Sequence, residues 1–387
     1  MKYRVMELIT CVLLMASFVN YGIAGSSCPP EEYISPWFCI KTSSSTQNFY
    51  TIVVCNRPEC KDHLYRVDGA AGHLVLDKVI ITGITNNDTD KDWNLKLPSR
   101  WLLMSRVREL EIRDTTLSDC FLCNNPFQEQ DQYLKKLVFS NCSLKGKLCN
   151  ECTTTIKKLV TTTTTTTTRR PRQYGFYSRN INHFPRSTSP EPKYEYTKIA
   201  NGIRMNGLTN AKSLESLDLS FNAIEEINSN AFPPEVSSLK ILVLSHNNIS
   251  VISSAAFTTL TSLSELDLSH NKLANLSRNI FDSPDSKLEV LNLNWNRISV
   301  LQENMFSLML ALKKVNIAHN FLQYIPSATW RQELGVIQTI DLSGNFLICD
   351  CDIKWILANE TEITGLCSAP WKFAYQPVKR AAATLIC

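Results

Sequence analysis

The sequence predicts an α/β solenoid, with short parallel strands on a concave face and irregular or short helical segments on the convex side. Each repeat carries the same frame of aliphatic residues, as in Leu214-x-x-Leu217-x-Leu219-x-x-Asn222-x-Ile224. The asparagine recurs at intervals of 25, 24, 25, 24 and 25 residues, at Asn222, Asn247, Asn271, Asn296, Asn320 and Asn345. A bulky aromatic residue follows ten positions after each of the first five asparagines, at Phe232, Phe257, Phe281, Phe306 and Trp330.

The Leu-x-Leu centre of each frame predicts a short strand, because alternate side chains of a strand point the same way. The asparagine must point inward for the repeats to stack, and its amide then satisfies backbone groups of the turn that would otherwise be buried unpaired. The aromatic residues are expected to fill the convex side. One repeat cannot bury its own apolar face, so neighbouring repeats stabilise one another. Six copies in register are typical of a leucine-rich repeat protein and exclude a periodic amphipathic helix.

The frame continues toward the N-terminus in degraded form. Strands are expected around Leu76 to Ile81, Val107 to Ile112 and Leu134 to Phe139, with a fourth beginning at Ile156. The sequence predicts these segments: a signal peptide (1–24), a cysteine-containing N-terminal flank (25–73), degenerate repeats (74–160), a low-complexity insertion (161–200), regular repeats (201–347) and a cysteine-rich C-terminal cap (348–387).

The insertion begins with the threonine run 161–168 and continues into the basic stretch 169–172. Such a composition cannot bury enough apolar surface to form a core, which indicates a loop or linker. An O-glycosylated stretch, a protease cleavage site ending at Arg172 and an insertion without a role are all compatible with it.

The N-terminus predicts secretion. Lys2 and Arg4 precede an apolar run from about Leu8 to Val19, and small residues at 22 and 24 favour cleavage after Ala24. That run is too short to span a membrane, and no later segment is long and apolar enough. The net charge of +4 is weak for a chain of 387 residues and does not indicate nucleic acid or an acidic membrane as the partner. Candidate N-glycosylation sites, which suit an extracellular protein, are Asn87, Asn141, Asn248, Asn275 and Asn359.

Thirteen cysteines follow the predicted signal peptide, and a secreted chain pairs cysteines as disulfides. If Thr115 and Cys142 occupy the asparagine position of adjacent repeats, the two Cys-x-x-Cys pairs lie at near-equivalent places. The pairs Cys120–Cys149 and Cys123–Cys152 are then favoured, while the swapped pairing and a zinc ribbon stay open. With an odd number of cysteines, inward-pointing Cys142 is expected to be the free thiol.

The run from Asn345 to Trp355 resembles the C-terminal flanking domain of extracellular leucine-rich repeat proteins. That family pairs the first cysteine with the third and the second with the fourth. The resemblance therefore implies the disulfides Cys349–Cys367 and Cys351–Cys387, in a cap that covers the end of the solenoid.

The run from Cys28 to Cys39 resembles the N-terminal flank of secreted arthropod leucine-rich repeat proteins, of the kind of the Oplophorus-type luciferin monooxygenase non-catalytic subunit. Trp37 stands where that flank usually has a cysteine. The resemblance keeps Cys28–Cys39 and leaves Cys55 without its usual partner, a role for which Cys60 lies close enough. It implies an extracellular protein without enzymatic activity.

The outward strand positions and the position before each asparagine form a candidate binding surface on the concave face. These positions mix acids, amides and aromatic residues, as a protein-binding surface does. Phe221 and Trp295 are candidate anchors, and the three histidines a candidate pH-sensitive edge. The alternative is that Ser-His-Asn merely fills the repeat frame. The candidates are Asp218, Phe221, His246, Asp267, His270, Asn292, Trp295, Asn316, His319 and Asp341.

Motifs of catalysis are absent from the sequence: there is no His-Glu-x-x-His, no Gly-x-Ser-x-Gly, no phosphate-binding loop and no dinucleotide fingerprint. We therefore expect no enzyme, no cofactor and no metal. The expected function is that of a secreted protein that binds an extracellular protein or glycan, as a recognition factor or as a partner subunit of an enzyme. The alternative is the ectodomain of a cell-surface receptor whose anchor lies outside this chain.

Overall fold

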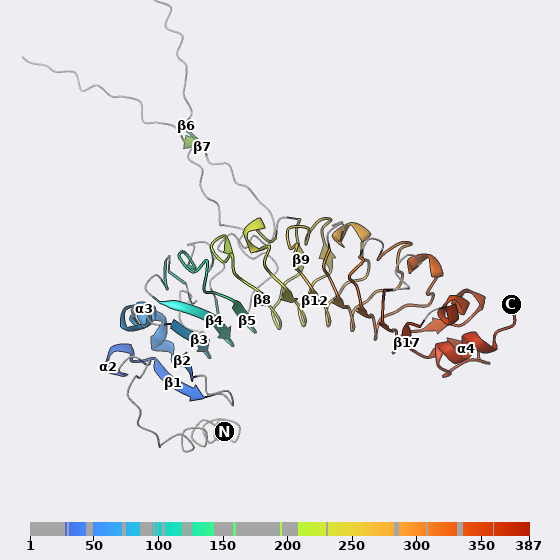
Figure 1. The fold of residues 1–387 in the computed structure, drawn as a ribbon, viewed down its shortest axis with the longest axis horizontal. Helices are drawn as coiled ribbons and strands as arrows, with labels where there is room; N and C mark the ends of the chain where they lie inside the picture. Colours follow the sequence, from blue (N-terminus) through green and yellow to red (C-terminus); the bar gives the residue numbers. More distant parts are fainter. Residues whose placement is uncertain are drawn as a thin grey trace, which may run out of the picture.

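The chain forms a curved solenoid whose inner face is a single twelve-stranded sheet (Figure 1). The structure is a computed structural model. It describes residues 158–159, 194–195 and most of 28–142 and 208–387, the latter two ranges without 29–30, 44–48, 72–74, 86–94, 96, 99, 103–104, 118–121, 123–125, 230, 282–285, 307–308, 331–335 and 359. The predicted signal peptide, the sequons at Asn87 and Asn359, and the two Cys-x-x-Cys pairs (Cys120, Cys123, Cys149 and Cys152) therefore lie outside the described residues.

Neighbouring strands of the sheet are parallel, except that β1 pairs antiparallel with β2. This arrangement confirms the predicted solenoid with parallel strands on its concave face. In spatial order the strands are β1 (Phe38–Ser43), β2 (Phe49–Cys55), β3 (Val75–Thr82), β4 (Arg106–Arg113), β5 (Lys136–Ser140), β8 (Ser216–Asp218), β10 (Ile241–Val243), β12 (Glu265–Asp267), β13 (Val290–Asn292), β14 (Lys314–Asn316), β15 (Thr339–Asp341) and β17 (Glu362–Thr364).

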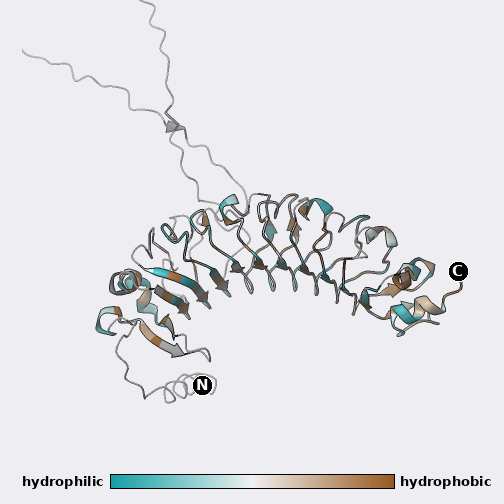
Figure 2. Cartoon of the chain, viewed as in Figure 1, coloured by the Kyte–Doolittle hydropathy of each residue, from teal (hydrophilic) through white to brown (hydrophobic). Residues whose placement is uncertain are grey.

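The regular repeats pair in strict register. Leu217 of β8 lies beside Leu242 of β10, which lies beside Leu266 of β12, and all three side chains are buried. The residues on either side of them point to the concave surface and are half-buried or exposed. Figure 2 shows hydrophobic residues recurring along the strands of the sheet, as alternation in a half-buried strand requires.

Each buried asparagine satisfies backbone groups of two neighbouring repeats, as predicted. The Asn271 Nδ2 donates to the carbonyl oxygens of Leu244, Leu268 and Ser269, each at 3.0 Å. Its Oδ1 accepts the backbone N–H of Ile249 at 2.9 Å. The amide therefore replaces the solvent that the turn excludes.

The convex side is built from turns and short helical segments around aromatic side chains. Phe232 lies 6.1 Å from Phe257 between ring centroids, and Phe306 lies 4.8 Å from Trp330. All four are buried, and the side chain of Phe281 is outside the described set. The short elements of the outer turns are β9 (Glu226–Ile227), η3 (Pro234–Val236), β11 (Val251–Ile252), η4 (Arg278–Phe281) and η5 (Ser327–Thr329).

The N-terminal flank joins the sheet, which its sequence did not indicate. It contributes β1 and β2, together with the helical segments α2 (Glu31–Ile34), η1 (Pro58–His63) and α3 (Leu64–Ala71). Trp37, which stands where the resembling proteins have a cysteine, is 1% exposed and belongs to the core. A large apolar side chain therefore fills this position.

The expected fourth degenerate strand is wrong as a member of the solenoid sheet. Residues 158–159 form β6 (Lys158–Leu159), which pairs antiparallel with β7 (Tyr194–Glu195) in a separate two-stranded sheet. Instead β5 pairs directly with β8, with Leu137 beside Leu217. The segment after Ile156 lacks the rest of the Leu-x-x-Asn frame, so the next segment able to stack begins at Leu214.

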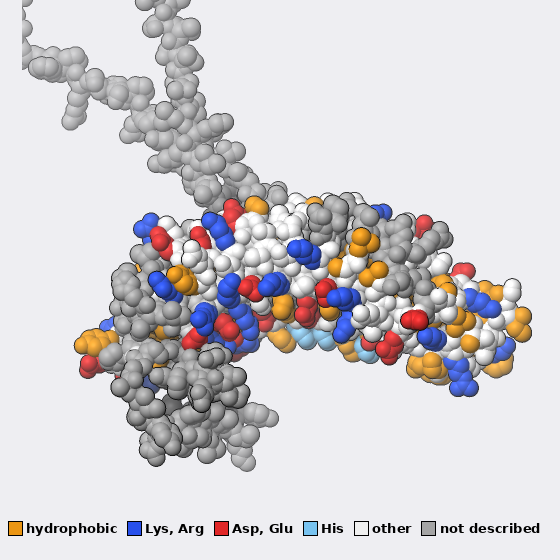
Figure 3. All heavy atoms as spheres, viewed as in Figure 1, with side chains coloured by type: hydrophobic (Ala, Val, Ile, Leu, Met, Phe, Trp, Pro, Cys, Tyr) orange, Lys and Arg blue, Asp and Glu red, His pale blue; other side chains and the backbone are white. Residues whose placement is uncertain are grey.

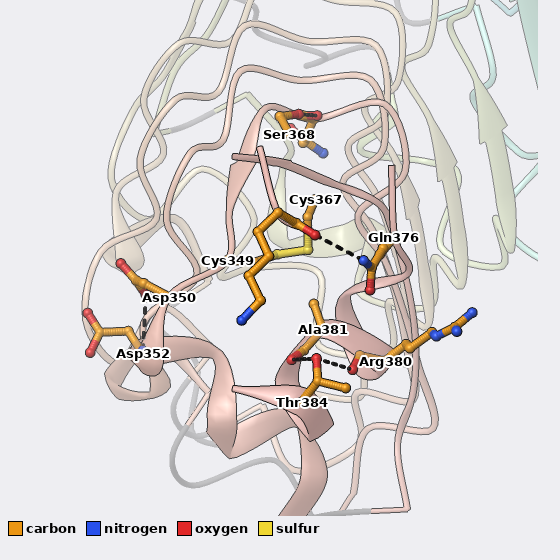
Figure 4. The surroundings of a disulfide bond; sticks show 11 residues. Cys349, Asp350, Asp352, Cys367, Ser368, Gln376, Arg380, Ala381 and Thr384 are labelled. Atoms are coloured by element: carbon orange, nitrogen blue, oxygen red, sulfur yellow. Dashed lines mark hydrogen bonds between the residues drawn. A yellow bond between two sulfur atoms is a disulfide. The ribbon is translucent and has the colours of Figure 1, made fainter. Parts of the chain in front are cut away.

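The C-terminal cap continues the solenoid through β17 and then closes it with a disulfide-bonded module (Figure 4). Cys349 donates its backbone N–H to Ala369 and bonds Cys367 through sulfur, which fixes β16 beside β18. Among the described residues no helix is long and apolar enough to cross a bilayer. The elements of the cap are β16 (Leu347–Ile348), η6 (Cys351–Ala358), β18 (Cys367–Ala369) and α4 (Val378–Thr384).

Candidate functional site

The residue before each repeat asparagine adopts a left-handed backbone conformation at the end of its strand. The φ angles are 56° for Phe221, 55° for His246, 52° for His270, 54° for Trp295 and 53° for His319. Each of these residues donates its backbone N–H to a carbonyl of the next repeat, as His270 does to Asn294 at 2.9 Å. The turn thus directs five side chains out of the solenoid along one edge of the concave face.

These five side chains form a continuous stack, here called the aromatic row. Ring centroids lie 4.2 Å apart between Phe221 and His246, 4.0 Å between His246 and His270, 5.6 Å between His270 and Trp295, and 4.1 Å between Trp295 and His319. No interplanar angle exceeds 11°. Figure 3 shows the histidines as a pale blue band on the concave edge.

The row is exposed although its members contact one another. Phe221 is 53% exposed and Trp295 is 50% exposed. The side chains border a shallow open hollow that reaches from Asn141 to Trp295. A surface of stacked rings loses little side-chain entropy when a partner covers it, because neighbouring rings already hold each ring in place.

The row ends at Gly344, whose φ is 69°. A Cβ at this position would lie 2.8 Å from the Cε1 of His319, which is closer than van der Waals contact allows. The imidazole of His319 therefore lies over the glycine. At the other end the same left-handed position is occupied by Asn141 and Asp114, and the Asn141 Nδ2 donates to the Asp114 Oδ1 at 2.7 Å.

The candidates on the strands lie beside the row and share a structural role. Asp218 accepts the backbone N–H of Ser220 at 2.9 Å through Oδ1, and Asp267 accepts that of Ser269 at 2.9 Å. This bond closes the turn between the strand and the row. The same bond is made by Asn292 to Asn294, by Asn316 to Ala318 and by Asp341 to Ser343.

The ten candidate residues thus form one strip of surface, with the row on one side and the strand positions on the other. Sequence reasoning found both columns but missed the ring stacking and the bonds that close the turns. A signal for the stacking is present in the sequence, because parallel strands in register repeat at about 4.8 Å, which is close to a stacking distance. Asn141 and Asp114 were missed because their repeats are degenerate.

The environment of two of these groups changes their acidity. Burial lowers the pKa of His270 below its ordinary value of 6.5, and the nearby His246 lowers it further while Asp267 opposes this. Burial acts to raise the pKa of Asp341, but hydrogen bonds from Thr364 and Ser343 outweigh it and the net direction is down. The environment therefore favours the carboxylate form of Asp341 and the neutral form of His270.

The concave surface of the N-terminal half has a different character. Glu111 of β4 lies 2.5 Å from the Lys78 Nζ and 3.2 Å from the Arg113 Nε. Burial acts to raise the pKa of Glu111, but these two cations lower it overall. Carboxylates there are thus paired with cations of the same or a neighbouring strand.

The described disulfides are Cys28–Cys39, Cys55–Cys60, Cys349–Cys367 and Cys351–Cys387, the pairs that the resemblance and the spacing had indicated. Cys142 is free and buried in the asparagine position, and its Sγ donates to Ile112 at 3.2 Å and to Ser140 at 3.3 Å. Burial raises the pKa of its thiol to about 12, which keeps the proton that these bonds need.

Three of the candidate glycosylation sites are described. Asn141 and Asn275 are exposed and Asn248 is partly buried. In the ranges that the structure describes, no group of three His, Cys, Asp or Glu side chains is arranged to hold a metal ion.

A match to a known family agrees with this architecture. The leucine rich repeat family matches residues 212–273 and 237–285. A search of the curated proteins finds no match to this chain. A solved structure, the octameric complex of Latrophilin 3, Unc5D and FLRT2, contains a chain 17% identical to this one, with 82% of each chain covered and a TM-score of 0.48.

The Drosophila Toll–Spätzle complex is a second structural likeness. In its glycosylated form the identity is 19% and the TM-score 0.44, and this chain is covered over 79% of its length. It spans 41% of the matched chain. The asparagine frame occurs six times, the parallel strands are in register, and the family match covers residues 212–285. The chain is therefore a leucine-rich repeat protein with disulfide-bonded segments at both ends of its solenoid.

Proposed function

We propose that this chain is a secreted, extracellular binding protein that recognises another protein through the aromatic row and the strand positions beside it. The observation that carries the proposal is the row itself: five stacked rings, two of them half-exposed, in a rigid strip of surface. Aromatic side chains anchor protein interfaces because they bury much area with few rotamers. A binding role is supported by the exposed aromatic rings and carboxylates of the strip, which are side chains that protein interfaces use.

The extracellular location is supported by chemistry at both ends of the chain. Four described disulfides stabilise the flanks, and such bonds persist in oxidising compartments. The signal-peptide pattern of residues 1–24 and the resemblance to secreted repeat proteins favour release over membrane anchoring. Expression in insect cells should place the protein in the medium with Gly25 as its first residue, and retention in washed membranes would contradict secretion.

The binding role is tested by site-specific photo-cross-linking on the full secreted chain. A photoreactive phenylalanine analogue at Trp295 should cross-link a protein from the extracellular fluid of the source tissue. The same analogue at Val300, which is 65% exposed in the same repeat but outside the row, is the matched control. The Phe221→Ala/Trp295→Ala double variant should reduce recovery of that protein while its unfolding temperature stays near that of the wild type.

The outcomes separate the possibilities. Equal cross-linking from Trp295 and Val300, or recovery that the double variant leaves unchanged, would move the binding surface away from the row. In that case the partner would bind at an edge of the solenoid or at one of its terminal flanks. The further role suggested by the resemblance, that of a non-catalytic subunit, would appear as a secreted enzyme among the cross-linked proteins.

A further inference from the structure

Three aspartates stand along the strand side of the aromatic row, and each has one oxygen in use. These are Asp218, Asp267 and Asp341, here called the carboxylate column. In each the Oδ1 accepts the backbone N–H that closes the turn, and the Thr364 hydroxyl donates to the same atom of Asp341. Over the described residues, the Oδ2 atoms of Asp218 and Asp267 take part in no hydrogen bond or ion pair, so these two carboxylates are fixed in place with one oxygen open. Asp341 is held by Thr364 and by Ser343 and adds a third negative charge to the column.

The column belongs to a half of the sheet whose charges are not compensated. From β8 to β17 the outward strand positions carry five carboxylates, because Glu265 and Glu362 join the column, and one cation, Lys314. Within the described part of the chain, none of these six groups forms an ion pair.

The contrast with the rest of the molecule shows that this is local. On β3 and β4 the carboxylates are neutralised by Lys78, Arg113 and Arg108. At the strand starts, Glu215 lies between Lys135 and Lys240 at 2.9 and 2.8 Å, and Glu289 pairs with Lys313 at 2.8 Å. Open negative charge on the sheet therefore gathers where the aromatic row is.

The chemistry next to the row selects its partner. Lys and Arg side chains have an apolar stem and a charged head, so a stem can pack along the ring edges while the head reaches an open carboxylate oxygen. Lys272 and Arg297 directly follow their asparagines and are exposed, so the cations of this stretch are not on the strand positions that carry the column. A polyanion meets like charge on the strand side and fits poorly.

We infer that the partner docks a basic segment on this surface, a stretch of polypeptide in which Lys or Arg alternates with apolar residues. The apolar residues cover the aromatic row and the cations bind the carboxylate column. This inference rests on the proposed function and names the chemical class of the partner that the same surface takes.

The test uses the full secreted chain and a synthetic peptide in which Arg alternates with Leu. A second peptide, in which Glu replaces each Arg, is the probe of opposite charge. The key variant is Asp218→Ser/Asp267→Ser/Asp341→Ser. A serine hydroxyl can accept the same backbone N–H, which preserves the turn. Asparagine is avoided because Ser220, Ser269 or Ser343 two residues later would complete a glycosylation sequence.

Two further variants keep the test independent of folding. Glu265→Gln/Glu362→Gln removes two exposed charges that make no hydrogen bond within the described residues. Glu225→Gln/Glu303→Gln/Glu360→Gln removes three exposed charges outside the sheet surface and is the matched control. Binding is measured by calorimetry at low and at high salt.

We expect the Arg peptide, and not the Glu peptide, to bind the wild type. The triple serine variant should bind about tenfold more weakly, as the loss of three exposed pairs implies, and the control should be unchanged. Salt should weaken wild-type binding more than that of the serine variant. The inference is overturned if the wild type and both surface variants bind the Arg peptide equally. It is also overturned if the control variant loses as much affinity as the serine variant, or if the Glu peptide binds the wild type. If the Arg peptide fails this test while Phe221→Ala/Trp295→Ala still reduces recovery of the extracellular protein that cross-links to position 295, the proposed binding surface stands and its basic partner falls.

Discussion

Asn271 shows how one side chain closes a turn of the solenoid. Its amide contacts four backbone groups of three segments, all within 3.0 Å. None of these groups reaches water easily, because Asn271 is 7% exposed. A residue that supplies both donors and an acceptor is therefore needed at this position in each regular repeat.

The change Asn271→Ala should lower the free energy of unfolding by about 3 kcal/mol, because a buried carbonyl or N–H without a partner is destabilising. Denaturant unfolding measures this. Lys272→Ala, which changes the adjacent exposed residue, is the control and should be near neutral. Similar stability of the two variants would contradict the role given to the asparagine column.

Single residues also show where prediction from sequence ends. The frame predicted that Cys142 points inward in the asparagine position, and its Sγ indeed bonds the carbonyls of Ile112 and Ser140. The frame could not show whether Asp218 or Asp267 serves binding or structure, because the same aspartate closes its turn through Oδ1 and leaves Oδ2 open. Only the hydrogen-bond geometry distinguishes the two atoms.

At the scale of the repeat, the aromatic row was predictable as a column and not as a stack. The register of Leu-x-Leu-x-x-Asn places Phe221, His246 and Trp295 at equivalent positions, which the sequence shows. Stacking also depends on the left-handed turn and on rotamers that bring the ring planes within 11° of one another. Residue type and spacing do not determine those angles.

Gly344 gives a test of how the row ends. Gly344→Ala should destabilise the chain more than Gly83→Ala. Both glycines have positive φ, 69° and 72°, so alanine is strained at each by about 1–2 kcal/mol. A Cβ at Gly83 meets nothing within 4 Å, whereas at Gly344 it meets the His319 imidazole. The difference between the two variants therefore measures that contact.

A double-mutant cycle isolates the contact further. In a His319→Ala background, Gly344→Ala should destabilise the protein no more than Gly83→Ala does. Thermal unfolding of the four proteins of the cycle and of the Gly83→Ala variant provides the comparison. If the penalty at Gly344 persists without His319, backbone strain and not the imidazole is its cause.

Protonation should weaken the fold through the row. His270 has a pKa below its ordinary 6.5 because of burial and the neighbouring His246, so the unfolded chain binds more protons in that range. Its contribution to stability is complete above pH 6.5 and is lost as the pH falls through the lowered value. His270→Phe should reduce the loss of stability between about pH 7 and pH 5.

Phenylalanine is the right replacement because Phe221 already adopts the same left-handed position and stacks on a histidine. Urea unfolding at a series of pH values measures the effect. His63→Phe changes a histidine of η1 and is the control. If the free energy of unfolding of His270→Phe changes with pH as steeply as that of the wild type, the pKa of His270 is the same in the folded and the unfolded chain.

At the scale of the whole molecule, the sheet is continuous although the insertion separates β5 from β8 in the sequence. β5 ends at Ser140 and its neighbour β8 begins at Ser216, yet Lys136, Leu137 and Val138 pair in register with β8. The ion pair of Glu215 with Lys135 crosses the same junction, whereas the pair of Glu215 with Lys240 joins β8 to the next repeat. Hydrogen bonds from Lys240 and Lys135 lower the pKa of Glu215 to about 2. The sequence predicted a linker between two repeat blocks. It could not predict that β1 and β2 extend the first block, since the N-terminal flank carries no repeat frame.

This continuity predicts the outcome of cleavage in the basic stretch 169–172. Limited trypsin digestion should cut there and leave the two fragments as one folded unit, held by the backbone bonds between β5 and β8 and by a shared core. None of the four described disulfides crosses residue 172, so denaturant without reductant should separate the fragments. Native mass spectrometry measures the first result and denaturing gel filtration the second. Fragments that part in native buffer would mean that the two halves of the solenoid fold as independent units, and the aromatic row, which begins at Phe221, would then need only the C-terminal half.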